Sequence, residues 1–93
     1  MLLHLFMTLH LLCRNKVKDY DFWKGGFDSD RAAQERAGLT LLNLWRSADD
    51  PNEVFFLFRV ADRTQAEDFM HSPEAAQAMR KYGVLAGASW FLR

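Results

Sequence analysis

Hydrophobic and polar residues alternate near the start of the chain. Between Leu3 and Leu12 one set of alternate positions is entirely aliphatic, and the other set is mixed and contains His4 and His10. A period of two predicts a β-strand whose two faces meet different surroundings. The polar run at 13–16 interrupts the alternation, which predicts a loop or bulge there.

The period then changes to that of a helix. Asp19 is suited to be an N-cap, and Tyr20, Trp23 and Phe27 follow at the spacing that lines one helical face. The adjacent glycines Gly25-Gly26 each cost roughly 1 kcal/mol relative to alanine in a helix interior. They therefore predict a kink, or a place where backbone or ligand comes close.

A second helical run is predicted at 31–37. Asp28 or Ser29 would cap its start, and Gly38 would end it in a left-handed conformation. A second strand is predicted from Leu39 to Arg46, with 39, 41, 43 and 45 on one face.

The turn residues at 49–52 separate this strand from a third, predicted from Glu53 to Ala61. The segment 54–58 is apolar at every position, which is typical of a strand covered on both faces. A sheet that contains it needs cover on both sides.

The last third of the chain predicts a helix and a strand. Thr64 has capping-box spacing to Glu67, and a restart at Ser72-Pro73 places the serine as N-cap and the proline at the first helical position. The helix is predicted to continue to Tyr82. The final strand is predicted over Val84 to Arg93.

The element order β-α-β-β-α-β predicts an α+β, ferredoxin-like fold for one domain over residues 1–93. Right-handed crossovers place two helices on one face of a four-stranded antiparallel sheet. The other face is then bare although the third strand is apolar on both sides. We therefore expect a homodimer through the open sheet face.

Amino-acid composition limits the kinds of binding partner and the cellular compartment that are expected. Half the chain, 49%, is hydrophobic, which is a heavy apolar load that suggests a buried partner surface or an apolar pocket. Zero net charge gives no indication of nucleic acid or an anionic membrane. A single cysteine, Cys13, excludes an internal disulfide and a multi-cysteine metal site and is typical of an intracellular protein. Because no basic residue precedes the first apolar run, we interpret it as a strand of a cytoplasmic protein with no membrane span.

Several motifs together resemble the dimeric α/β-barrel superfamily, in particular its small, uncharacterised bacterial members sometimes labelled cyclases. These motifs are Val17-Lys18-Asp19-Tyr20-Asp21-Phe22-Trp23, Phe27, Ala37-Gly38-Leu39, Asp49-Asp50-Pro51-Asn52-Glu53, Phe69-Met70-His71-Ser72-Pro73-Glu74 and Gly83-Val84. One departure is that residues 11–16 separate His10 from Val17, whereas the family pattern places the histidine close to the valine. The resemblance implies a cleft between sheet and helices, used by relatives that include cofactor-independent monooxygenases, haem-degrading enzymes, polyketide cyclases and lactone isomerases. Fold alone does not choose among them.

Two histidines are the candidate acid/base groups, because imidazole titrates near neutrality. His10 would end the first strand and His71 the first half of the second helix. The alternative is that His10 is a hydrogen-bonded strand-end residue and His71 caps a helix C-terminus.

An aromatic clamp is the candidate ligand site. It would use Trp23, Trp45 and Trp90 with the amide of Asn43, while Gly26 and Phe27 would lie beside the ligand. The alternative is that these aromatic residues belong to the core or to a dimer interface.

The sequence predicts no reaction. The first hypothesis is a homodimer that holds a small apolar or aromatic molecule between helices and sheet, without cofactor or metal. The second is a cofactor-independent monooxygenase or a polyketide-type cyclase in which His10 or His71 moves a proton and Trp23, Phe27 and Trp90 orient the ring. A third is an RNA-recognition module with Phe56 and Phe58 as stacking residues, but its basic glycine-aromatic signature and positive charge are missing.

Overall fold

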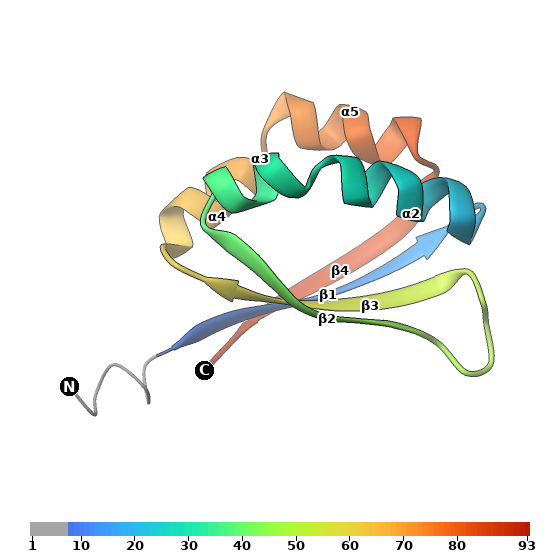
Figure 1. Ribbon diagram of the computed structural model, residues 1–93, viewed down its shortest axis with the longest axis horizontal. Helices are drawn as coiled ribbons and strands as arrows, with labels where there is room; N and C mark the ends of the chain where they lie inside the picture. Colours follow the sequence, from blue (N-terminus) through green and yellow to red (C-terminus); the bar gives the residue numbers. More distant parts are fainter. Residues whose placement is uncertain (1–7) are drawn as a thin grey trace.

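The structure, a computed structural model, describes residues 8–93. Four strands form one antiparallel sheet in the order β2-β3-β1-β4, and the helices cover one of its faces (Figure 1). The elements in chain order are β1 (Leu9–Val17), α2 (Tyr20–Ser29), α3 (Arg31–Arg36), β2 (Leu39–Arg46), β3 (Glu53–Val60), α4 (Arg63–Met70), α5 (Pro73–Lys81) and β4 (Val84–Leu92). This confirms the α+β, ferredoxin-like arrangement, with each crossover built from two consecutive helices.

The core lies between the helices and the sheet. Trp23 and Phe27 of α2 are buried, and their rings stack with centroids 4.8 Å apart. Phe27 also lies 4.8 Å from the ring of Phe56 in β3, which contacts Phe58 edge-on at 5.6 Å. The helical spacing at the start of α2 thus correctly predicted which side chains seat this helix on the sheet.

The first strand extends further than predicted. β1 continues through the segment 13–16, so the segment is not a loop; the register against β4 shifts at its end, between Lys16 and Val17. Its polar residues Arg14 and Lys16 occupy the alternate positions, on the face away from the helices, while Cys13 and Val17 remain buried. Arg14 pairs with Glu53 of the adjacent β3 at 2.7 Å. Residues 3–7 of the predicted strand lie outside the described residues.

The glycine pair does not kink α2, which runs without a break from Tyr20 to Ser29. Asp19 caps it as predicted, by accepting a hydrogen bond from the Phe22 amide at 2.9 Å. The cap of α3 is Asp30 and not Asp28 or Ser29. Those two side chains are engaged elsewhere, Asp28 with Lys24 at 2.6 Å and Ser29 with the Gly26 carbonyl at 2.7 Å.

A β-bulge at Leu42 changes the faces of β2. Leu41 pairs with Phe58 but Asn43 pairs with Leu57, so one residue is inserted between them. Beyond the bulge Leu44 faces the helices, and Asn43 and Trp45 face away. The single alternation predicted over this strand is therefore wrong after position 41.

The second half of the chain follows its local signals closely. Ser72 caps α5 by accepting from the Ala75 amide at 3.1 Å, with Pro73 at the helix start as predicted. Asp62, and not Thr64, caps α4, accepting from the Gln65 amide at 2.9 Å.

The sheet face opposite the helices is uncovered and carries several apolar side chains. Leu42, Trp45, Trp90 and Leu92 are between 41% and 48% exposed there, beside the half-buried Phe55 and Leu57. Phe56 and Phe58, the stacking residues of the RNA-recognition hypothesis, point the other way and are buried beneath the helices.

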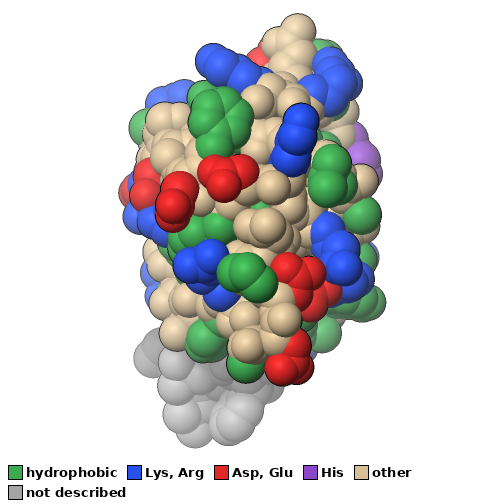
Figure 2. Space-filling model, turned by 90° about the vertical axis from the view of Figure 1, so that its right-hand side faces the viewer, with side chains coloured by type: hydrophobic (Ala, Val, Ile, Leu, Met, Phe, Trp, Pro, Cys, Tyr) green, Lys and Arg blue, Asp and Glu red, His purple; other side chains and the backbone are tan. Residues whose placement is uncertain are grey.

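Charges are mixed on the molecular side shown in Figure 2. Basic and acidic side chains are interspersed there with hydrophobic ones, and neither sign dominates. No helix within residues 8–93 is long and apolar enough to cross a membrane.

Candidate ligand-binding cavity

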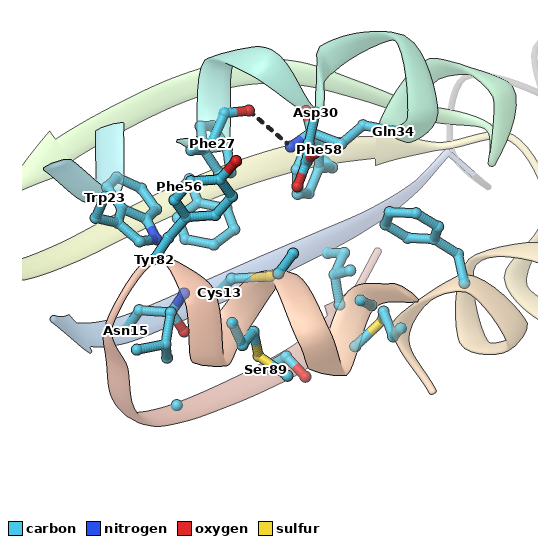
Figure 3. Close-up of a pocket in the computed structure, with 18 of the residues that line it drawn as sticks. Cys13, Asn15, Trp23, Phe27, Asp30, Gln34, Phe56, Phe58, Tyr82 and Ser89 are labelled. Carbon is cyan, nitrogen blue, oxygen red and sulfur yellow. Dashed lines mark hydrogen bonds between the residues drawn. The ribbon is translucent and has the colours of Figure 1, made fainter. Parts of the chain in front are cut away.

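A cavity of about 390 Å³ lies between the helices and the sheet. β1, β3 and β4 form its floor, and the two helical crossovers form its walls (Figure 3). Its lining residues are Leu11, Cys13, Asn15, Trp23, Phe27, Asp30, Gln34, Phe56, Phe58, Phe69, Met70, Ala75, Ala78, Met79, Tyr82, Val84, Gly87, Ala88 and Ser89. The volume falls within the range of sites for small molecules, about 300–1,000 Å³.

Eight of the nineteen lining residues are aromatic residues or methionines. Trp23, Phe27 and Phe56 form a continuous aromatic wall, with centroid separations from 4.8 to 5.8 Å. Met70 and Met79 contribute flexible thioethers from α4 and α5, which adapt to the shape of a bound group. The cavity is therefore suited to a flat, largely apolar molecule.

A few polar groups interrupt this apolar surface. Asn15, Asp30, Gln34, Tyr82 and Ser89 are the side chains that can exchange hydrogen bonds with an occupant. Asn15 is on β1 beside Gly87 of β4, and a Cβ at Gly87 would lie 2.7 Å from the Asn15 side-chain oxygen. The glycine thus leaves space for the Asn15 amide at the cavity floor.

Cys13 does not supply a nucleophile. Its thiol is buried in the core, and burial raises its pKa to about 12. The thiol stays protonated at neutral pH, and the thiolate is the reactive form. Cys13 therefore contributes a small, neutral, polarisable surface to the cavity.

The structure brings Trp23 and Phe27 to the cavity, as expected for ligand-binding residues. Gly26 does not line it, but the Tyr82 ring that does so lies directly against the Gly26 backbone. The prediction for the glycine pair was an approach of backbone or ligand; in the structure the close neighbour of Gly26 is a side chain, that of the α5 C-cap residue, and Gly25 has open space. The ligand-binding role of all three remains a prediction.

The two histidines lie away from this cavity. His10 lies on β1, where it pairs with Arg59 of β3 and Leu92 of β4. It belongs to the alternate set of β1 side chains that faces away from the helices. His71 is the exposed C-cap residue of α4, a position that favours positive charge. The structure therefore brings neither to the candidate ligand, and their catalytic role remains a prediction.

The remaining members of the predicted clamp are on the uncovered sheet face. Asn43 pairs with Leu57, Trp45 with Phe55, and Trp90 with Leu12, all on the outer side of the sheet. Among the three tryptophans, only Trp23 reaches the cavity.

Sequence reasoning missed the polar lining residues. The polar run that contains Asn15 predicts a loop or bulge, although an alternating set continues through it, formed by Leu9, Leu11, Cys13 and Val17. That set was the available signal for the strand. Gln34 carried no signal of this kind, because its burial depends on how α3 packs in three dimensions.

Metal ligands do not cluster in the described part of the chain. Within residues 8–93, no three His, Cys, Asp or Glu side chains are placed to hold a metal ion together.

No protein-family model matches the sequence, and no curated protein matches it. Solved structures do match the fold. A Bordetella bronchiseptica protein provisionally named an antibiotic biosynthesis monooxygenase superimposes with a TM-score of 0.74 at 14% identity, covering 92% of this chain and 95% of that one. SnoaB from Streptomyces nogalater, a cofactor-independent oxygenase, has a TM-score of 0.73 at 16% identity, covering 92% and 91%. A Nitrosomonas europaea protein with the same provisional name as the first gives 0.68 at 13%, covering 91% and 88%.

These likenesses establish the fold, as the identities are far below those that carry an activity from one protein to another. The ferredoxin-like architecture implied by the sequence resemblance is the one these proteins share with the chain.

Proposed function

We propose that the protein binds a small, flat, largely apolar molecule in the cavity between its helices and its sheet. The observation that carries the proposal is a volume of about 390 Å³ lined by an aromatic wall and a few polar groups. This combination is the usual chemistry of a small-molecule site. Stacking on Trp23 and Phe27 would orient the ring plane of the ligand.

Fluorescence and native mass spectrometry test this proposal. Trp23 is the tryptophan that lines the cavity, so an aromatic probe such as 2-methoxynaphthalene is expected to alter its emission in a saturable way. Native mass spectrometry of freshly purified protein should also show any co-purified ligand as an added mass. The absence of saturable binding by any flat aromatic probe would contradict the proposal.

The protein is proposed to act as a homodimer through the uncovered sheet face. Support comes from the row of apolar side chains on that face, which includes Trp45, Trp90 and Leu92. A second copy would remove these groups from water, and burial of apolar surface is the main driving force of association. The resemblance to dimeric α/β-barrel proteins favours the same face.

A second candidate function is cofactor-independent oxygenation of a phenolic molecule in the same cavity. The fold likeness to SnoaB, a cofactor-independent oxygenase, favours it. In such a reaction O₂ converts a phenol to a quinone, with one oxygen atom becoming the new carbonyl and the other leaving as water. Asp30 is the lining group suited to accept the phenolic proton, because neither histidine lines the cavity.

Oxygen uptake distinguishes this candidate from binding alone. An oxygenase would consume one O₂ per quinone formed when given a naphthol, and Asp30→Asn would slow turnover with little loss of binding. Saturable binding of a panel of phenols without oxygen uptake would contradict the oxygenase hypothesis and support a protein that only binds its ligand.

A further inference from the structure

Gln34 is a buried polar residue whose hydrogen bonding is incomplete. It lies on α3 with 5% of its surface exposed, and its side chain is part of the cavity lining. The amide nitrogen lies 3.5 Å from the carbonyl oxygen of Phe27, the contact drawn in Figure 3. The amide oxygen has no hydrogen-bond partner within residues 8–93.

The contact with Phe27 decides which amide atom stays free. A backbone carbonyl only accepts hydrogen bonds, so the side-chain nitrogen must face it. The reversed amide would place the Gln34 oxygen against the Phe27 oxygen, which already accepts from the Asp30 backbone amide at 3.2 Å. The unpaired group of Gln34 is therefore an acceptor, and burying an acceptor without a partner is costly.

Asp30 adds a second acceptor to the same lining. Its carboxylate forms no ion pair within the described part of the chain, and no lysine, arginine or histidine lines the cavity. Like charges at short range repel one another. An anionic ligand would thus meet a like charge with no cation to offset it.

We propose that Gln34 and Asp30 make this cavity selective for neutral ligands that donate a hydrogen bond, and that they exclude anions. The ligand class is a flat molecule with an O–H or N–H group that reaches the Gln34 amide oxygen. The inference rests on the proposed function, because it concerns the occupant of the same cavity. A water molecule is the competing partner for that oxygen, and the comparison of ligands below separates the two.

Three probes of one size test the selectivity. At pH 7, 2-naphthol is neutral and donates a hydrogen bond, 2-methoxynaphthalene is neutral and cannot donate, and 2-naphthoate is an anion. For the wild-type protein, titration calorimetry should give 2-naphthol an affinity about tenfold higher than 2-methoxynaphthalene, the usual effect of one hydrogen bond. The affinity for 2-naphthoate should be lower than for both.

Two variants assign the selectivity to the named residues. Gln34→Met keeps the length of the side chain and removes the acceptor, so the preference for 2-naphthol should fall to about onefold. Asp30→Asn removes the charge, so the affinity for 2-naphthoate should rise while the preference for 2-naphthol is retained. Asp30 makes no side-chain cap bond to α3, so this change is expected to leave the fold intact.

The outcomes separate this inference from the proposed function. If 2-methoxynaphthalene and 2-naphthol bind wild type equally, the inference is wrong and the binding cavity stands. If no probe binds, both are wrong. The wild-type comparison decides the matter even where Gln34→Met fails to fold.

Discussion

The ring of Tyr82, at the C-terminal end of α5, lies directly against the backbone of Gly26 in α2. A Cβ atom on Gly26 would overlap the ring. Phe22, one turn earlier in α2, lies on the same ring with centroids 5.8 Å apart. Because Tyr82 also lines the cavity, this contact fixes one end of the site as well as the distance between the two helical crossovers.

Substitution at the two neighbouring glycines should have opposite effects. Gly26→Ala forces Tyr82 or α2 to move and is expected to lower the free energy of unfolding by roughly 1–3 kcal/mol. Gly25 is exposed with open space at its Cβ position, so Gly25→Ala should raise it by up to about 1 kcal/mol through helix propensity. Urea unfolding measures both, and a similar change in the two variants would contradict the assigned contact.

The buried thiol of Cys13 should make stability fall at high pH. Its pKa is about 12 in the folded protein and 9.0 as its ordinary value. Between these values the unfolded chain loses the proton and the folded chain keeps it. The free energy of unfolding should therefore be unaffected by this group below pH 9 and fall by about 1.4 kcal/mol per pH unit above it.

Cys13→Ala provides the comparison, because it removes the thiol and leaves every other titrating group. Urea unfolding at pH 8, 9.5 and 10.5 should show a steeper decline for the wild type, with an excess of about 2 kcal/mol at pH 10.5. Parallel declines in the two proteins would show that the thiol is accessible to water in the folded state.

A bulky residue placed inside the cavity should block ligand binding. Ala78 lines the cavity from α5, and Ala78→Phe is expected to weaken the binding of 2-methoxynaphthalene by at least about tenfold, since the ring would occupy the site. Gln77→Phe is the matched control, because Gln77 is exposed on the same helix and does not line the cavity. Equal affinities for the two variants would place the ligand elsewhere.

A charge on the uncovered sheet face should disrupt the proposed dimer. At micromolar concentration, light scattering should give the wild type twice the chain mass of 10.8 kDa. Trp90→Glu should give a monomer, because an unpaired charge in an apolar interface is costly. Ala32→Glu, on the exposed surface of α3, should remain dimeric. A monomeric wild type would refute the dimer.

The architecture was predictable because its signals are local. The β2 strand from Leu39 to Arg46 and the start of α5 at Ser72-Pro73 match the structure, since periodicity and capping chemistry depend on nearby residues. The Trp23 and Phe27 side of α2 was predictable for the same reason.

The polar part of the site was not predictable in this way. Gln34 is buried only because α3 packs close to Phe27, and the Leu42 bulge depends on pairing with β3. Both are set by contacts between elements, α3 with α2 and β2 with β3, and not by the residues of one element alone. The histidines show the opposite error. Side-chain chemistry makes His10 and His71 candidate catalytic residues, but the fold places both outside the cavity.

The bulge at Leu42 has a consequence for how this sequence can vary. It acts as a phase shift in β2, because a regular strand that kept Leu42 would exchange the inward and outward side chains of everything downstream. Trp45 would then turn toward the helices and Leu44 toward the outer face. Deletion of Leu42 would instead remove the bulge and leave each downstream side chain on its present face.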